Sequence, residues 1–525
     1  MTQRSGPRGA TVSAEPRSRR RDVALVGVGV ALTIVLSAAV AQRSIVGYGL
    51  LAALALVTLF LLVRRHLARI RIGDLLIAGL IALPALALLG PSFAHPSFPQ
   101  LFAFRLLLVL VGFVGVTYLI IARPTPLHFA AGDVALPVAL WFAWMCIGLL
   151  WASEKPAALN YLAIVVTMLA LLAATATAGS TRRRLRAFAF TMLAAYVLIV
   201  GFTVLEARLG VRLPTSRLLT TVTSQTYAVT SVFHNQNDLA TYIAFCWPFM
   251  LCAFFFTRRP LWLILSVACM VLGAAAFVRT GSRSSLVAIG LSSFAAVVLF
   301  AQVGPRVSTR AGKIVGALVV VVLVGGAGYL LFNDSESSML RQFRLESLLA
   351  QSRSGTGSGA IRTGLTSQGL ETAGGTFLVG AGPGQAEVMI SSGVNALGIS
   401  NLHNWWLETY VNGGLVGFAL HLIFFVGLVA TTWPIARRDP DPFVRYLASG
   451  TVLALVGFTV GALGPSSSVS FAPMWILYGL GLAVVSRARL AAREGALPEA
   501  ALSSPPGAAA DRAVDSRLAG AEVGA

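Results

Sequence analysis

Long apolar runs separated by short polar segments occupy most of the chain. Fourteen such runs lie near residues 23–41, 45–63, 75–90, 104–121, 134–151, 160–178, 187–205, 238–256, 261–278, 285–302, 313–332, 414–433, 446–463 and 471–486. A helix needs about 20 consecutive apolar residues to cross a hydrocarbon core of ~30 Å. The pattern therefore predicts an all-α, polytopic membrane protein with about 14 transmembrane helices and a lower bound of about 12.

The composition agrees with this fold class. Of the 525 residues, 56% are hydrophobic and only 11% are charged, and the mean hydropathy is +0.79. Soluble domains carry roughly 25% charged residues, so a cytosolic enzyme, a disordered scaffold and a secreted disulfide domain are all excluded. The four cysteines lie inside apolar runs, where thiols behave as small hydrophobic side chains and form no external disulfide framework.

Basic residues recur at alternate connections between the apolar runs, within a formal net charge of +20. These basic connections lie at residues 19–21, 64–71, 182–186, 258–259, 306–313 and 437–438. Lys and Arg accumulate in the cytoplasmic loops of membrane proteins. We therefore expect a multi-pass protein of the cell (plasma) membrane with both termini in the cytoplasm, and we attribute the positive charge to topology rather than to nucleic acid.

The same pattern predicts five consecutive segments. Residues 1–22 form a disordered basic tail, 23–332 contain transmembrane helices 1–11, 333–413 form an extracytoplasmic loop with surface helices, 414–486 contain helices 12–14, and 487–525 form a disordered tail. The first apolar run ends in Ala39-Val40-Ala41, which resembles a signal-peptidase site. Cleavage there would leave the orientation of the later helices unchanged.

Two predicted outer segments, 206–237 and 333–413, are too long to be simple connections. Long loops in compact proteins are usually functional elements. Both segments contain arginines, against the usual charge bias of outer loops. We therefore expect the chemistry of this protein at the extracytoplasmic face.

Five outer arginines are candidates for binding an anion: Arg212, Arg217, Arg279, Arg283 and Arg362. The forked guanidinium group suits phosphate oxygens, and a diphosphate needs several such donors. The alternative for each arginine is an ion pair, for example with Glu206 or Glu346, or contact with lipid headgroups.

The outer turn Arg279-Thr280-Gly281-Ser282-Arg283-Ser284-Ser285 precedes an apolar run. Two arginines there can combine with a helix N-terminus to bind an anion. The alternative is that Ser282 or Ser284 simply caps the helix.

A histidine stands at the end of the second long loop, in the segment Asn401–Gly417. Residues 405–411 are expected to form a short helix at the membrane surface before the next span starts at the glycines. His403 at its start can act as a base near neutral pH, although a lone histidine is more often a cap or hydrogen-bond partner. Weaker candidates are His95, His234 and Glu154, the last of which is also explained as part of a solvated turn.

Several of these motifs together resemble the O-antigen ligase and polymerase superfamily of bacterial envelope glycosyltransferases. The resemblance covers roughly residues 225–435. It rests on the Arg279–Ser285 turn, on Arg362 followed by Gly380-Ala381-Gly382-Pro383-Gly384, on His403-Asn404 followed by Leu407 and Gly414-Leu415-Val416-Gly417, and on the asparagine-rich stretch His234-Asn235-Gln236-Asn237-Asp238. Gln236 stands where the family usually has Pro, Asn412 where it has an acidic residue, and Leu365 where it often has Trp.

The resemblance implies a fold of the GT-C class and a metal-independent, inverting transfer of a glycan. The donor would be a glycan linked to a polyprenyl diphosphate, and the acceptor a lipid or another glycan at the outer face. Arg279, Arg283 and Arg362, with Arg212 or Arg217, would hold the diphosphate. His403 would activate the acceptor hydroxyl, Asn404 would hold its neighbours, and Asn235 and Asn237 are further candidates. No cofactor is implied.

The residues themselves agree with the absence of a cofactor. No outer Cys/His cluster has the spacing of metal ligands, and Asp439-Pro440-Asp441 is best explained as a loop breaker. The glycine-rich stretch 355–359 lacks the Lys-Ser/Thr of a nucleotide-binding loop and is expected to be a flexible linker. We further expect the glycines at 355–359 and 380–384 to act as hinges for a lid.

Three other functions remain open. Within the enzyme class, a polymerase would use the same donor as a ligase and differ only in the acceptor. A transporter or flippase would suit the number of spans, although such proteins usually place polar groups at mid-membrane and show internal repeats. The third alternative is a non-catalytic assembly partner.

Overall fold

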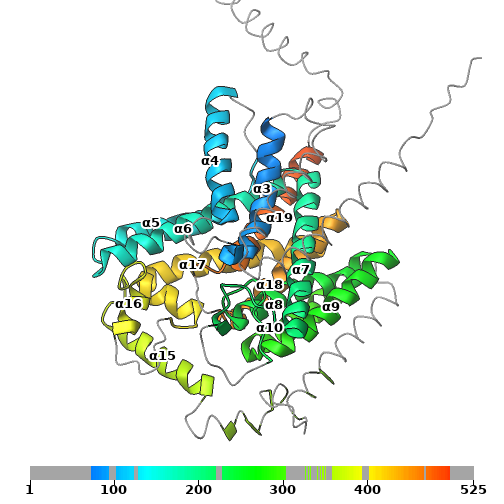
Figure 1. The fold of residues 1–525 in the computed structure, drawn as a ribbon. Helices are drawn as coiled ribbons and strands as arrows, with labels where there is room; N and C mark the ends of the chain where they lie inside the picture. Colours follow the sequence, from blue (N-terminus) through cyan, green and yellow to red (C-terminus); the bar gives the residue numbers. More distant parts are fainter. Residues whose placement is uncertain are drawn as a thin grey trace, which may run out of the picture.

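The computed structural model describes residues 72–93, 102–122, 128–219, 227–302, 357–392, 401–465 and 469–496, with a few isolated residues between 325 and 350. Within these ranges the regular secondary structure is entirely helical (Figure 1). Ten of the described helices are long and apolar enough to cross a membrane, and the apolar helix Gly132–Gly148 is slightly shorter. The protein is therefore a multi-pass, all-helical membrane protein, as the sequence predicted.

The helices coincide closely with the predicted spans. They are α3 (Ile72–Leu89), α4 (Ala103–Ala122), α5 (Gly132–Gly148), α6 (Lys155–Ala176), α7 (Arg182–Leu209), α8 (Gln236–Phe256), α9 (Pro260–Thr280), α10 (Arg283–Gln302), α17 (Trp405–Arg438), α18 (Pro442–Gly461) and α19 (Ala472–Ala496). Two more helices, α15 (Gly357–Gly374) and α16 (Gln385–Ser392), lie between α10 and α17. The predicted spans 23–41 and 45–63, nearly all of 313–332, and the predicted signal-peptidase site lie outside the described residues, so the count of 14 stays a prediction.

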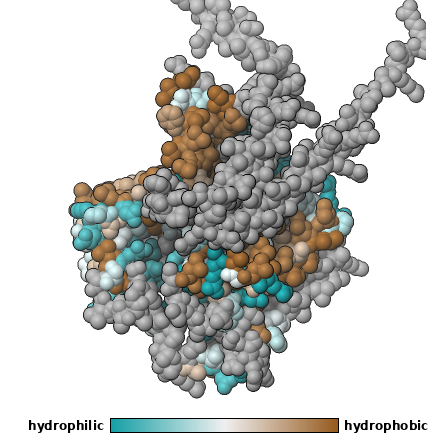
Figure 2. Space-filling view, in the orientation of Figure 1, coloured by the Kyte–Doolittle hydropathy of each residue, from teal (hydrophilic) through white to brown (hydrophobic). Residues whose placement is uncertain are grey.

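The centre of the bundle is formed by α8, α18 and α19, in whose apolar windows 72%, 67% and 78% of the residues are buried. At the periphery, only 6% of the residues of α4 are buried. Figures 1 and 2 show α4 projecting from the top of the molecule with hydrophobic side chains on its surface. A mostly exposed apolar helix is stable in a bilayer, because lipid tails cover it. All four cysteines are free, as expected.

One end of the bundle is fastened by ion pairs between helix termini. Arg182 at the start of α7 pairs with Asp441, which caps α18, at 2.5 Å. Arg489 near the end of α19 pairs with Asp133 at the start of α5. We refer to this as the Asp441 end of the bundle, and to the opposite one as the His403 end.

One feature of the described ends differs from the sequence prediction. Helix α19 continues to Ala496, so residues 487–496 belong to a helix and not to a disordered tail. Arg487 and Arg489 stabilise this extension by pairing with Glu494 and Asp133. The Asp439-Pro440-Asp441 turn caps α18 through Asp441, whose carboxylate accepts a hydrogen bond from the N–H of Phe443.

Helix α17 is interrupted at Gly414, whose backbone (φ 62°, ψ −166°) is not helical. The prediction of a short helix before the glycines is thus confirmed. This helix packs against the rest of the protein, since Trp405 is only 3% exposed and Glu408 is equally buried, and its place at the membrane surface stays a prediction. The rings of Phe458 and Trp475 pack against Trp405 and so bury this side of the short helix.

The segment 377–382 fills the opening in α17. The N–H groups of Leu415 and Val416 donate to the carbonyls of Phe377 and Leu378, and the carbonyls of Val411 and Asn412 accept from Ala381 and Gly382. These four bonds give new partners to backbone groups that the kink removes from the helix, and buried backbone groups in membrane proteins require such partners.

This joint is closely packed, and the hinge motion expected for its glycines stays a prediction. Gly380 and Gly414 both have positive φ angles, and a Cβ added to Gly380 would lie 2.3 Å from the nitrogen of Gly414. Two tryptophans of α5 and its following turn, Trp144 and Trp151, donate to the carbonyls of Gly413 and Gly380. Residues 357–359 of the predicted flexible linker are the first turn of α15.

Candidate functional site

His403 lies immediately before α17 in a strained backbone conformation. Its φ angle is 48°, and Ser231 is the other non-glycine residue with positive φ in the described ranges. Such a conformation costs energy and persists only where the surroundings hold it. The neighbours Leu402 and Trp405 are 2% and 3% exposed, so packing on both sides of His403 supplies that restraint.

The imidazole of His403 is neutral at physiological pH. Burial lowers its pKa to about 4, and the positive charges of Arg362 and Arg217 lower it further, while a backbone hydrogen bond with Pro465 opposes them. Its Nδ1 atom is buried and has no hydrogen-bond partner in the described part of the chain. His403 is therefore able to accept a proton.

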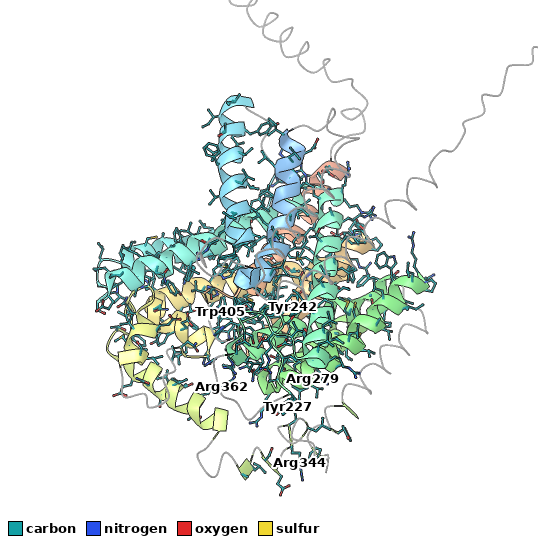
Figure 3. The ribbon with its side chains drawn as sticks, in the orientation of Figure 1. Tyr227, Tyr242, Arg279, Arg344, Arg362 and Trp405 are labelled. Atoms are coloured by element: carbon teal, nitrogen blue, oxygen red, sulfur yellow. The ribbon has the colours of Figure 1, made fainter. Side chains whose placement is uncertain are left out.

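Two further arginines, on two separate helices, lie in the same region as His403. Arg362 lies on α15, and burial together with the nearby charge of Arg283 lowers its pKa. Arg283 is the first residue of α10. Figure 3 shows Arg362 and Arg279 on the same side of the molecule. Like charges brought together in a partly buried place repel one another, unless an anion lies between them.

Arg217 completes the cluster from the 210–235 loop. The Nη2 atom of Arg217 donates to Oε1 of Gln236 at 2.9 Å, and the backbone N–H of Arg217 donates to the carbonyl of His234. Burial lowers its pKa, and the carboxylate of Asp238 opposes that shift. The residue that replaces the family's usual proline, Gln236, thus orients an arginine. We call His403, Arg217, Arg283 and Arg362 the His403 cluster.

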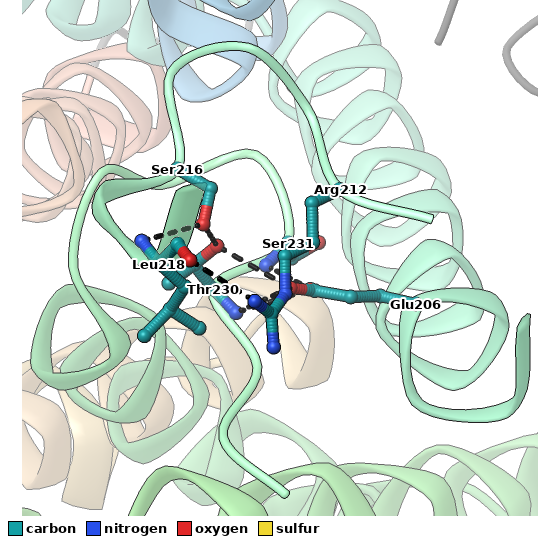
Figure 4. A network of polar contacts seen from close by, with 6 residues as sticks. All are labelled: Glu206, Arg212, Ser216, Leu218, Thr230 and Ser231. Atoms are coloured by element: carbon teal, nitrogen blue, oxygen red, sulfur yellow. Dashed lines mark hydrogen bonds and ion pairs between the residues drawn. The ribbon is translucent and has the colours of Figure 1, made fainter. Parts of the chain in front are cut away.

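A buried carboxylate holds the loop that carries Arg217 (Figure 4). Glu206, near the end of α7, is 3% exposed and accepts hydrogen bonds from the N–H groups of Thr230 and Ser231. The Thr230 hydroxyl donates to Ser216, whose hydroxyl accepts from the N–H of Leu218. Glu206 and Thr230 therefore link the part of the loop just before Arg217 to the part around residue 230.

Arg212 belongs to this network and not to the His403 cluster. Its Nη1 donates to the carbonyl of Leu218 at 3.1 Å, and its Nε lies 4.0 Å from the carboxylate of Glu206 (Figure 4). The ion-pair alternative considered for the outer arginines is what the structure shows for Arg212.

Arg279 lies in the last turn of α9, four residues before Arg283, and Gly281, with a φ angle of 68°, caps the end of α9. Ser282 lies between the two arginines and donates to Ser285, which follows Arg283 and contacts Thr241 of α8. This small hydroxyl cluster fixes the turn and hence the base of the Arg283 side chain.

The three candidate asparagines lie at the N-termini of helices. Asn404 caps α17 by accepting from the N–H of Leu407, and Asn235 caps α8 by accepting from the N–H of Asn237. Both satisfy helix N-terminal donors. Asn237 lies in the first turn of α8, where its carbonyl accepts from Thr241.

Glu154 precedes α6 and is exposed, as expected for a solvated turn. Its backbone N–H and carbonyl both bond to the side chain of Gln385, at the start of α16. Asn412, where the family usually has an acidic residue, accepts from the N–H of Ala386 in the same helix. These contacts attach α16 to the bundle. His234 is exposed and bonds the carbonyl of Thr215 through Nδ1, and His95 lies outside the described residues.

Sequence reasoning missed a group of hydrogen-bonded side chains around Trp405, two residues after His403. The Nε1–H of Trp405 donates to Nε2 of His421 at 3.3 Å, and the hydroxyl of Tyr478 lies 3.1 Å from the same atom. Because an indole N–H can only donate, Nε2 of His421 must be unprotonated. The sequence alone assigns no role to His421, since nothing in the spacing connects it to Trp405, 16 residues earlier.

The described residues contain no group of three or more His, Cys, Asp or Glu that could hold a metal ion. The site is instead a cluster of cations around a neutral imidazole at one end of a helical membrane bundle. That is the class of site expected for binding an anionic substrate at a membrane surface.

Comparison with known proteins agrees with the motifs. Residues 268–422 match the model of the O-antigen ligase family. The chain is also 24% identical over 417 residues to the teichuronic acid biosynthesis protein TuaE of Bacillus subtilis (strain 168), covering 77% of this chain and 82% of that protein. The two findings support the O-antigen ligase superfamily, a class of membrane proteins of polysaccharide biosynthesis, and so confirm the resemblance.

The family match includes Arg279, Arg283, Arg362, His403 and His421. Arg217 lies outside it, and its place in the cluster rests on the effect of its charge on His403.

Proposed function

We propose that this protein is an integral membrane glycosyltransferase of the O-antigen ligase type. It transfers a glycan from a polyprenyl diphosphate carrier to a lipid or cell-envelope acceptor at the extracytoplasmic face. The observation that carries the proposal is that Arg217 and Arg362 lie close enough to a neutral His403 to lower its pKa, with Arg283 close to Arg362. The match to the O-antigen ligase family and the likeness to a teichuronic acid biosynthesis protein support the same class of substrate.

In the proposed reaction, the acceptor hydroxyl oxygen attacks the anomeric carbon of the donor glycan in a single inverting displacement. The bond between that carbon and the diphosphate oxygen breaks, and its electron pair stays on the diphosphate. The proton of the acceptor hydroxyl passes to His403, whose low pKa keeps it neutral before the reaction. No metal or cofactor takes part in this scheme.

The arginines of the cluster bind the diphosphate and stabilise the charge that develops on it as the bond breaks. Donors fixed in place before the reaction are the most effective source of such stabilisation. Arg362 comes from α15 and Arg283 from α10. An anion bound by both arginines would therefore connect α15 to the transmembrane bundle. Protonated His403 would then lie beside a diphosphate whose negative charge has increased, which favours the proton transfer.

The experiment that tests this function is turnover by the purified protein with a polyprenyl diphosphate-linked glycan and an acceptor. Replacing His403 by Ala should abolish transfer while leaving expression and thermal stability nearly unchanged. Full turnover by the H403A protein would refute the assignment. Movement of intact donor across a vesicle membrane without transfer would instead indicate a flippase.

A polymerase would use the same cluster and donor with another carrier-linked chain as acceptor. The glycan profile of a deletion strain separates the two. Full-length unattached chains are expected for the ligase, whereas accumulated short carrier-linked units would indicate the polymerase.

A further inference from the structure

A second group of arginines lies at the Asp441 end of the bundle, away from the proposed reaction. The guanidinium carbon of Arg186 lies 5.7 Å from the ring centre of Phe443, and that of Arg445 lies 5.6 Å from the ring centre of Phe256. Tyr446 lies between the two rings, at 6.4 Å from Phe443 and 6.3 Å from Phe256. We call these five residues the arginine–aromatic patch.

The patch combines three helix ends. Arg186 comes from the first turns of α7, Phe256 is the last residue of α8, and the other three residues come from the first turns of α18. Arg258 and Arg259 follow Phe256 directly. Each guanidinium lies within the ~6 Å at which a cation is attracted to an aromatic face, so the rings hold the two arginines at the surface of the bundle end.

The positive charge of this region is only partly compensated. Helix α7 begins with Arg182-Arg183-Arg184 and Arg186, and no acidic residue lies in its first turn. Cations at a helix N-terminus are unfavourable, because the helix dipole is positive there. Asp441 pairs with Arg182, and Asp439 is the acid that faces Arg445, whereas Arg186 pairs with no acid in the described residues.

A hydrogen-bond donor also remains unused in the patch. The Nε atom of Arg445 is buried and has no hydrogen-bond partner within the described ranges. An arginine N–H can only donate. A buried donor without an acceptor is costly, and an anionic oxygen placed there would satisfy it.

We propose that the arginine–aromatic patch binds the headgroup of an anionic phospholipid. Phosphate oxygens would accept from Arg186 and Arg445, and the acyl chains would continue along the apolar surfaces of the helices. Tyr446 favours a lipid over a soluble anion, because tyrosines at the ends of spans occupy the interface between headgroups and acyl chains. Basic residues near an anionic leaflet strengthen lipid binding by roughly an order of magnitude for every one or two charges.

The test is native mass spectrometry of the full-length protein in detergent with phosphatidylglycerol or phosphatidylcholine added. We expect the wild type to retain phosphatidylglycerol preferentially, and R186Q/R445Q to bind it about tenfold more weakly. The matched control is R183Q/R493Q, which removes two exposed arginines from the same end without touching an aromatic ring of the patch. Its binding should weaken less than that of R186Q/R445Q, because neither of its arginines contacts a ring of the patch. R186Q alone provides the comparison if the double variant is not folded.

Three results would overturn the proposal. Equal weakening in both double variants would show that only the diffuse charge matters. Equal retention of the two lipids would remove the electrostatic selectivity. Release of the lipid by inorganic phosphate at the same concentration would indicate a site for a soluble anion. Because His403 plays no part in this test, its outcome is independent of the proposed transfer reaction.

Discussion

At the scale of single residues, the site depends on a histidine that stays neutral because it is buried among arginines. The pKa of His403 is about 4, with burial as the first cause and the charges of Arg362 and Arg217 as further ones. Between pH 4 and 6.5 the unfolded chain therefore binds a proton at this residue that the folded protein excludes. Stability from this residue is present above pH 6.5 and is lost as the pH falls towards 4.

We predict that replacing Arg362 by Gln raises the pKa of His403, because one nearby positive charge is removed. The new value should lie above 4 and remain below 6.5, since burial is the larger cause. The pH dependence of diethyl pyrocarbonate modification of His403, followed by mass spectrometry, measures this pKa. R344Q is the control, because Arg344 pairs with the exposed Glu346. An unchanged pKa in R362Q would contradict the proximity of the two side chains.

A second residue-scale prediction separates two arginines that the sequence could not distinguish. Arg217 belongs to the His403 cluster, and Arg212 to the Glu206 network. R217Q should lower kcat/KM by about 100-fold, as expected when one donor to a developing charge is lost. R212Q should change kcat/KM less than about threefold and lower the free energy of unfolding by about 1 kcal/mol. Transfer assays and thermal unfolding of the two proteins check both values. A reversed order of kcat/KM would place Arg212 in the site.

At the scale of elements, the site is assembled by the opened helix α17. The exchanged backbone bonds between residues 377–382 and 411–416 fix α15 and α16 relative to His403. A small apolar core that includes Leu365, Leu402 and Leu407 supports the same arrangement. Leu365, where the family often has Trp, is a packing residue of this core. Arg362 is thereby kept beside His403 although 41 residues separate them.

Glycine 380 provides a test of this joint. A Cβ there would lie 2.3 Å from the nitrogen of Gly414 and 2.6 Å from the carbonyl oxygen of Asn412, both of them backbone atoms. We predict that G380A lowers kcat about 100-fold, because a shift of about 1 Å between catalytic groups has this effect. G364A is the control, since a Cβ at Gly364 meets no atom within 4 Å and Ala stabilises a helix by about 1 kcal/mol. Wild-type turnover by G380A would show that the joint does not position the site.

Trp405 and His421 form the second anchor of α17. The Trp405 backbone N–H donates to the carbonyl of Ala462, and its indole N–H donates to His421. We predict that W405F and H421L each lower kcat several-fold, and that the double variant is no worse than the poorer single variant, because both remove the same hydrogen bond. KM for the donor should stay constant. Additive losses in this double-mutant cycle would mean that His421 acts independently of Trp405.

At the scale of the whole molecule, hydropathy predicted the described spans well because lipid requires long, continuous apolar helices. Residue type also predicted which side chains could serve the chemistry. It could not predict their convergence, because Arg217, Arg283, Arg362 and His403 come from four elements. Glu206 was considered only as an ion-pair partner, and the sequence assigned no role to His421. Their roles depend on contacts across the bundle.

The arrangement of the ends leads to a prediction about orientation. The His403 end contains the turn after α5, the end of α7 and the starts of α8, α10 and α17. The Asp441 end contains the starts of α7 and α18 and the end of α19. These are the two groups that the distribution of basic residues assigned to opposite sides of the membrane. One measurement of sidedness therefore orients the whole bundle.

Single cysteines at Glu154 and Arg183 provide that measurement, in a protein whose exposed Cys146 is replaced by Ala. Both positions are exposed and lie at opposite ends of the bundle. A membrane-impermeant maleimide added to intact cells should label E154C, and should label R183C only after the membrane is opened. The reverse pattern would place His403 in the cytoplasm, where nucleotide-activated sugars are the usual donors and a carrier-linked glycan has no need to react. The labelling result and the transfer assay must therefore agree, because the proposed chemistry is possible only on the side where the complete carrier-linked glycan is exposed.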